Sequence, residues 1–191
     1  MLLACRLTLP LAALVLLLAA APASTRYVVE GQGSDVSARV AFFGIASKTA
    51  RFPDISGEVR IDRARPQDLS IDVTIDARTL QAPDSITLGR LKGEKFFWIE
   101  KYPTIRFVGN RMAMRDATGG SVAGELTARG VTRPVTLDIA FDRAPASAEP
   151  GEALALTGTT TIDRREFGMT SYSLIVGKKV DITIKARMIP G

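Results

Sequence analysis

The side chains that most often carry enzyme chemistry are scarce in this chain. It contains no histidine, and its one cysteine is Cys5. Without histidine there is no Ser-His-Asp triad, no HExxH zinc site and no imidazole general base. Because Cys5 lies in a leading segment that we expect to be removed, thiolate catalysis and cysteine-based zinc sites are excluded as well. We therefore expect a protein that is not an enzyme and needs neither a metal ion nor a cofactor.

Carboxylates are the remaining candidates for acid–base chemistry. Asp72 and Asp76 lie in one alternating stretch and would share one face of a strand. Four residues at roughly 3.4 Å each separate them by about 14 Å, whereas the paired acids of glycosidases lie about 5 to 9.5 Å apart. We expect both side chains on a solvated outer face. A pair of acids from different strands is the alternative.

Guanidinium groups bind phosphate or carboxylate through paired N–H donors. Arg129 and Arg133 flank Gly130 in a turn, and Arg164 and Arg165 follow a later strand. The favoured interpretation is that these arginines are ordinary solvated turn residues, and binding of a phosphate or carboxylate head group is the alternative.

The elements that would position these residues are strands. Residues 69–78 alternate strictly between apolar and polar types, as a strand with one dry and one wet face does. Four other stretches alternate in the same way, and glycine-rich turn signals lie between them, so about eight to nine strands are expected. The alternating positions are Leu69, Ile71, Val73, Ile75 and Ala77; Val180, Ile182, Ile184, Ala186 and Met188; Val135, Leu137, Ile139 and Phe141; Val36, Ala38, Val40 and Phe42; and Leu154, Leu156, Gly158, Thr160 and Ile162.

One helix interrupts the series, at about residues 84–98, with Asp84 or Ser85 as its N-cap. Pro53 and Gly57 indicate an edge, bulge or bend within residues 49–61. The three adjacent bulky residues at 96–98 cannot all face one core, so at least one should meet a ligand, another element or solvent.

One-sided strands of this number bury their apolar faces by closing into a barrel or folding into a sandwich. The interior of an eight-stranded barrel can be filled by side chains or can hold one ligand. An outer-membrane barrel would instead place the apolar face outward with aromatic girdles, and only 6% of the residues are aromatic. Inward or outward placement of the apolar side chains decides between these architectures.

The first 23 residues have the composition of a secretory signal peptide. One positive charge at Arg6 precedes an apolar run, and Ala21-Pro22-Ala23 supplies a small-x-small cleavage site. The run is shorter than the roughly 20 residues of a spanning helix, which favours cleavage over a membrane anchor. Residues 24–191 would then form one domain. The net charge of +5 comes without runs of like charge, so nucleic acid is not an expected partner.

Three segments together resemble the YceI-like family of polyisoprenoid-binding proteins. Residues 96–107, FFWIEKYPTIRF, are similar to its aromatic segment. Residues 124–137, GELTARGVTRPVTL, resemble its GxLTxxGVTxPVxL hairpin, and residues 162–169, IDRREFGM, resemble the step before its final strand. The likeness covers residues 27–189 in matching order. A polar RDxHL sequence common in the family is replaced here by Thr87-Leu88-Gly89-Arg90-Leu91.

The resemblance implies an extended lipocalin-like antiparallel β-barrel, periplasmic, whose apolar interior holds a long isoprenoid chain such as a polyprenyl phosphate or a quinone. The expected partner is this lipid, without stable membrane insertion, and a homodimer is consistent with the sequence. Candidate head-group residues are Arg90 and Arg164. Candidate residues of the apolar tunnel are Phe42, Leu88, Leu91, Phe96, Phe97, Trp98, Phe107, Phe167 and Met169.

Three functions are therefore consistent with the sequence. The first is a non-enzymatic carrier or store of an isoprenoid lipid, which requires a long apolar cavity. The second is a structural or interaction module of the cell envelope with a solid barrel. The third is an enzyme that acts through carboxylates, which requires two acids in one cleft.

Overall fold

A computed structural model describes residues 24–149 and 151–191. The predicted signal peptide, residues 1–23, lies outside the described residues and stays a prediction. The described chain forms nine strands, one α-helix and three short 3-10 helices. In chain order these are β1 (Ser24–Phe42), β2 (Ala46–Phe52), β3 (Ile55–Asp62), β4 (Ser70–Asp76), η1 (Ala77–Thr79), α1 (Ser85–Lys92), β5 (Thr104–Asp116), β6 (Gly119–Ala128), β7 (Val131–Phe141), η2 (Pro145–Ser147), β8 (Leu154–Asp163), η3 (Arg164–Phe167) and β9 (Val176–Pro190).

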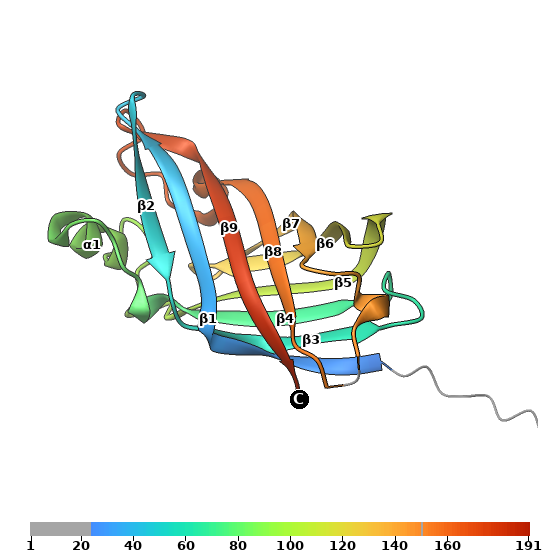
Figure 1. Ribbon diagram of the computed structural model, residues 1–191. Helices are drawn as coiled ribbons and strands as arrows, with labels where there is room; N and C mark the ends of the chain where they lie inside the picture. The colour runs from blue at the N-terminus through green and yellow to red at the C-terminus, as the bar shows by residue number, and fades with distance from the viewer. Residues whose placement is uncertain (1–23, 150) are drawn as a thin grey trace, which may run out of the picture.

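The strands form one antiparallel barrel (Figure 1). Strands β3 to β8 each pair with the next strand in sequence, and β1 closes the barrel between β3 and β9. The ninth strand, β2, pairs with the outer half of β1 alone, from Val36–Phe52 to Phe42–Ala46. The result is a closed eight-stranded barrel with one extra strand, as the sequence predicted.

The apolar face of each strand points into the barrel. In β4, Ile71 is 4% exposed, whereas the neighbouring Asp72 faces outward and forms an ion pair with Arg106 of β5 at 2.6 Å. The period-two pattern of the sequence thus predicted correctly which residues face the interior. This inward placement contradicts the outer-membrane alternative, in which the apolar face would point outward. No helix among the described residues is long and apolar enough to span a membrane.

Helix α1 is shorter than the predicted helix over residues 84–98. It begins after Asp84, whose carboxylate accepts a hydrogen bond from the Thr87 N–H, and ends at Gly93. Gly93 is extended at ψ 174°, and its N–H is shared between the carbonyls of Gly89 and Arg90. Successive turns follow, and Trp98 has a φ of 47°, which a right-handed helix does not allow. The apolar spacing of residues 96–98 therefore belongs to turns instead of a helix.

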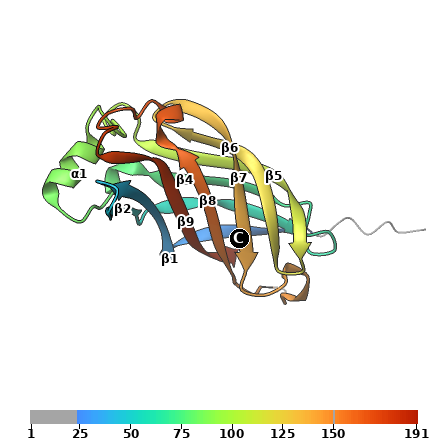
Figure 2. The same ribbon diagram turned by 90° about the horizontal axis from the view of Figure 1, so that it is seen from above.

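The two ends of the barrel differ. We call the end that carries the β1–β2 hairpin, α1 and η3 the mouth, and the end that carries both described termini the base. Figure 2 shows α1 and the hairpin at the same end of the barrel, opposite the turn between β5 and β6. The longest connection, 77–103, lies at the mouth, and so does the connection 164–175.

Candidate functional site

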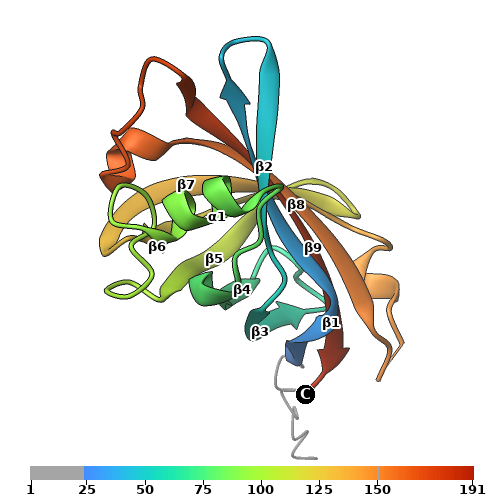
Figure 3. The ribbon, with the colours of Figure 1, turned by 90° about the vertical axis from the view of Figure 1, so that its left-hand side faces the viewer.

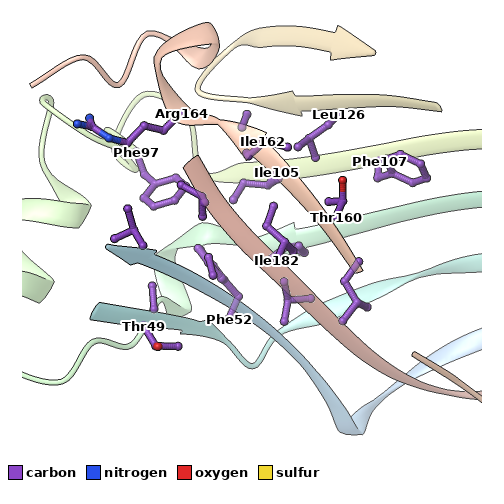
Figure 4. Close-up of a pocket in the computed structure, with 18 of the residues that line it drawn as sticks. Thr49, Phe52, Phe97, Ile105, Phe107, Leu126, Thr160, Ile162, Arg164 and Ile182 are labelled. Atoms are coloured by element: carbon purple, nitrogen blue, oxygen red, sulfur yellow. The ribbon is translucent and has the colours of Figure 1, made fainter. Parts of the chain in front are cut away.

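A cavity of about 500 Å³ opens at the mouth and runs into the barrel. In Figure 4, Phe97 and Arg164 lie at one end of it and Phe107 at the other, with Ile105, Leu126 and Ile182 between them. This volume is in the usual range of small-molecule sites, which is roughly 300 to 1,000 Å³.

The wall of the cavity is mostly apolar, with many aliphatic residues and several aromatic ones. All nine strands contribute to it through their inward-facing positions, because the alternation places every second residue on the lumen. Small residues recur in the wall, so opposite strands do not touch across the lumen. The wall includes Ala38, Val40, Ala50, Val73, Ile75, Ile105, Leu126, Ala128, Val135, Gly158, Thr160, Ile162, Val180, Ile182 and Ile184.

Phe107 forms part of the floor. Gly109 and Gly124 pair across β5 and β6, and a Cβ on Gly124 would lie 2.5 Å from Cζ of Phe107. The ring therefore lies over two residues without side chains, in space that any larger residue would fill. Below this floor the barrel is solid. The side chains that fill the base are Tyr27, Ile61, Leu69, Met112, Val122, Phe141 and Leu154.

Polar side chains gather where the cavity opens. Lys48 of β2 and Asp84, the N-cap of α1, form an ion pair at 2.8 Å, and both line the mouth. Hydrogen bonds from Lys48 and from the Thr87 N–H hold the pKa of the Asp84 carboxyl well below its usual value. Asp84 is the one carboxylate among the described lining residues. A second acid that could act together with Asp84 is not found among the described residues that line this cavity.

An aromatic stack stands beside the opening. Phe96 and Tyr172 are parallel, with ring centroids 5.9 Å apart. Arg90 and Lys95 each lie 5.5 Å from the Tyr172 ring, and Arg164 lies 5.8 Å from the Phe96 ring. Cations favour the negative face of an aromatic ring. The stack thus brings three positive charges to the edge of an apolar cavity.

Arg164 is buried, with 3% of its surface exposed, and is held by the main chain. Its guanidinium donates hydrogen bonds to the carbonyls of Gly177, at 2.9 Å, Val176, at 3.0 Å, and Met169. Burial lowers the pKa of this guanidinium from its ordinary value. Arg164 therefore fastens the segment between η3 and β9, and Arg90, on the exposed side of α1, is the more accessible cation at the opening.

The structure places most of the predicted site residues around the cavity. Leu88, Trp98 and Phe167 are not among the described lining residues. Phe167 is fully buried in η3, and Trp98 packs edge-on against Tyr102 at 5.8 Å. The predicted residues that line the cavity are Phe42, Arg90, Leu91, Phe96, Phe97, Phe107, Arg164 and Met169.

The predicted list omitted the aliphatic wall and the tip of the last loop. Val180, Ile182 and Ile184 of β9 line the lumen, as do Tyr172 and Ile175. The alternation of β9 was a sufficient signal for its three wall residues. Tyr172 and Ile175 belong to a loop and follow no period, so the sequence carried no equivalent signal for them.

The other candidate charges lie outside the cavity. Asp72 and Asp76 are on the outer face, paired with Arg106 and Arg78. Hydrogen bonds from these arginines lower the pKa of both carboxyls. Arg129 joins two loops at the mouth, because it donates hydrogen bonds to the carbonyls of Gly168, at 2.8 Å, and Glu94, at 2.9 Å. The ion pairs of Asp72 and Asp76 and the hydrogen bonds of Arg129 connect strands and loops, and none of these side chains lines the lumen.

Known proteins share this architecture. The crystal structure of BcnA from Burkholderia cenocepacia superposes with a TM-score of 0.74 at 24% identity, over 83% of this chain and 98% of that one. A polyisoprenoid binding domain from Saccharophagus degradans superposes with a TM-score of 0.65 at 13% identity, over 86% of this chain and 98% of that one. A protein named UPF0312 from Pseudomonas putida is 27% identical over 140 residues, which is 73% of each chain.

The chain also matches the model of one protein family over most of its length. The model of the YceI-like domain matches residues 27–188, from the first buried tyrosine of β1 to the last buried methionine of β9. This range includes all the strands that close the barrel and every described residue that lines the cavity. The chain belongs to the YceI-like domain family.

Proposed function

We propose that this protein binds a long-chain isoprenoid lipid, with the tail in the cavity and the head group at the mouth. The observation that carries the proposal is the shape and chemistry of the cavity, which is a deep, predominantly apolar lumen with its charged groups at the opening. The solved polyisoprenoid binding domain of the same fold supports this choice of ligand. The hollow lumen also argues against the alternative of a solid-cored module.

Burial of the tail is sufficient to drive binding. Each methylene-sized group moved from water into an apolar site contributes about 0.8 kcal/mol. A tail that buries about 15 carbons would gain about 12 kcal/mol before the costs of association and ordering. An isoprenoid tail carries no charge or hydrogen-bonding group, so the length and width of the lumen would set the selectivity.

The mouth offers cations to a head group. Arg90 and Lys95 are exposed beside Tyr172, and neither forms an ion pair within the described chain. A polyprenyl phosphate would pair with them directly, and a quinone would accept hydrogen bonds from them. We propose that the protein acts as a carrier or store of such a lipid in the periplasm, after its signal peptide is removed.

The experiment that tests the proposal is mass spectrometry of organic extracts from protein purified from its native host. A matched pair of variants makes it specific. Ala38 and Ala41 lie on the same strand, and only Ala38 faces the lumen. Ala38→Phe should abolish lipid recovery by filling the lumen, whereas Ala41→Phe should leave it unchanged. Equal recovery from both variants, or extracts of the unaltered protein without lipid, would contradict the proposal.

A further inference from the structure

The largest exposed apolar side chains of the described residues lie together at the mouth. Ile45 is 95% exposed, Leu174 97%, Ile86 67% and Phe43 60%. They stand on three separate segments, the β1–β2 hairpin, the loop before β9 and the first turn of α1. We call these four residues the apolar rim. The other large exposed apolar residues, Val108, Met114 and Ile189, are only 38–39% exposed and belong to β5 and β9.

The hairpin and the loop are held side by side. The Phe43 N–H donates a hydrogen bond to the Ile175 carbonyl at 2.8 Å, and Phe42 pairs with Val176. The ion pair between Lys48 and Asp84 joins the hairpin to the start of α1. In Figure 3 the hairpin, the loop ahead of β9 and α1 stand around the near end of the barrel. The four residues of the apolar rim therefore lie on linked segments around the opening of the cavity.

Exposed cations surround this surface. Lys178 and Lys179 are exposed at the start of β9, and Arg90 and Lys95 are exposed on and after α1. Within the described residues none of the four forms an ion pair. On the strands of the barrel wall, by contrast, Arg26 and Arg106 each pair with a carboxylate. Unpaired positive charge beside protruding apolar tips complements the anionic phosphates and acyl chains of a bilayer.

We propose that the apolar rim docks this protein, mouth first, onto a lipid bilayer that contains anionic lipids. Scattered single apolar residues on a surface are normal, but a ring of them around a cavity opening indicates an interaction site. The four side chains project from separate tips, which suits insertion between head groups by about 5 to 10 Å. An isoprenoid tail could then pass from the acyl chains into the lumen without crossing water. Docking itself requires no lipid in the cavity.

The test is flotation of purified protein with vesicles of phosphatidylethanolamine and phosphatidylglycerol. Ile45 and Leu174 are almost fully exposed, so a double change to serine should leave the fold intact. Ile45→Ser with Leu174→Ser should weaken vesicle binding at least about tenfold. The matched control is Val108→Ser with Met114→Ser, which removes two exposed apolar residues of β5. The control should bind as the unaltered protein does.

Charge is tested on the same vesicles. Lys178→Gln and Lys179→Gln should each weaken vesicle binding about fivefold at low salt. One lysine near an anionic surface contributes a binding free energy that corresponds to about this change in affinity. Vesicles of pure phosphatidylcholine should bind more weakly than the anionic vesicles. Circular dichroism of each variant establishes that it is folded.

Three results would overturn the proposal. The unaltered protein could fail to float with anionic vesicles. The rim variant could bind as well as the β5 control does. The rim could instead join two copies of this chain, in which case sedimentation velocity would show a dimer that the rim variant loses, without vesicle binding. Lipid recovery from the rim variant is measured separately, so loss of docking and loss of tail binding are distinguishable.

Discussion

The base and the mouth half of this barrel are built from the same strands but have opposite interiors. At the base, large side chains such as Tyr27, Met112 and Phe141 meet and fill the lumen. In the mouth half, small residues such as Ala38 and Gly158 occupy equivalent inward positions and leave a cavity. The alternation of the strands is the same in both halves. The volume of the inward side chains therefore decides which half supports the fold and which half can hold a ligand.

The difference has an energetic consequence. Side chains of the base touch neighbours on all sides, as in the close-packed core of other proteins. Side chains of the wall touch neighbours on one side and face empty space on the other, so they lack part of the dispersion energy of a packed core. A ligand that fills the lumen would restore those contacts. We expect the two halves to respond differently to mutation and to lipid.

The boundary between the halves should depend on Phe107. Phe107→Ala would open the floor toward the base and cost about 3 to 5 kcal/mol of stability when nothing fills the space. Lipids recovered with this variant should be longer than those from the unaltered protein, as measured by mass spectrometry. Phe141→Ala, which removes a ring from the base alone, should cost a similar amount without lengthening the lipid. The same lipid lengths from both variants would show that Phe107 is not the limit.

Two isoleucines compare the halves directly. Ile61 is fully buried in the base, and Ile182 lines the cavity. Ile61→Ala should lower the free energy of unfolding by about 2 to 5 kcal/mol, and Ile182→Ala by about 1 kcal/mol in lipid-free protein. Denaturant titration measures both values. Equal losses would mean that the wall of the lumen is as tightly packed as the base.

Arg164 is a buried side chain that stabilises the loop before β9 at the mouth. Arg164→Met should lower stability by about 2 kcal/mol, since carbonyls of three residues lose a charged donor. Amide exchange over residues 168–176 should accelerate more than exchange in β4. The control is Arg165→Met, because the Arg165 side chain is exposed and pairs with Asp163 only. Faster exchange throughout the barrel would indicate a global effect instead of a local one.

The smallest expected effect is a pH dependence at the mouth. Hydrogen bonds from the side chain and N–H of Arg165 lower the pKa of Asp163 from 3.8 to about 2. A carboxyl whose pKa is lowered on folding stabilises the protein above its unfolded pKa and loses that contribution as pH falls through its folded pKa. The thermal midpoint of unfolding should therefore decrease as the pH is lowered from 4 to 2, and Asp163→Asn should make this decrease smaller. An unchanged pH profile in the variant would contradict the assignment.

The sequence was a good guide to the barrel wall because alternation is a direct consequence of strand geometry. Ile71, Val73 and Ile75 were expected to share one face, and they do, with Asp72 and Asp76 opposite. Alternation could not distinguish the hollow half of the barrel from the filled half. It predicts the face of the strand on which a side chain lies, but not which side chains lie opposite it across the lumen. That information depends on which strands face each other after closure.

The mouth was harder to predict because it is made of turns. Phe96, Phe97 and Trp98 are adjacent, yet Phe96 stacks on Tyr172, Phe97 packs on Phe52 at 5.4 Å, and Trp98 turns toward Tyr102. The positive φ of Trp98 separates it from its neighbours, and no periodicity signals such a reversal. The three bulky neighbours do not share one core, and Trp98, which was predicted to line the lumen, packs on Tyr102 instead.

The pairing of β1 with β9 has a consequence for folding kinetics. These strands lie at opposite ends of the described chain, and their register runs from Tyr27–Pro190 to Phe42–Val176. Contacts between residues so distant in sequence require the closure of a very long loop, and topologies rich in such contacts fold slowly. The lumen has no complete wall until the last strand has been synthesised and has joined the first. A ligand can therefore be enclosed only after β9 has been synthesised. The pairing of β1 with β9 should limit the rate at which the cavity forms.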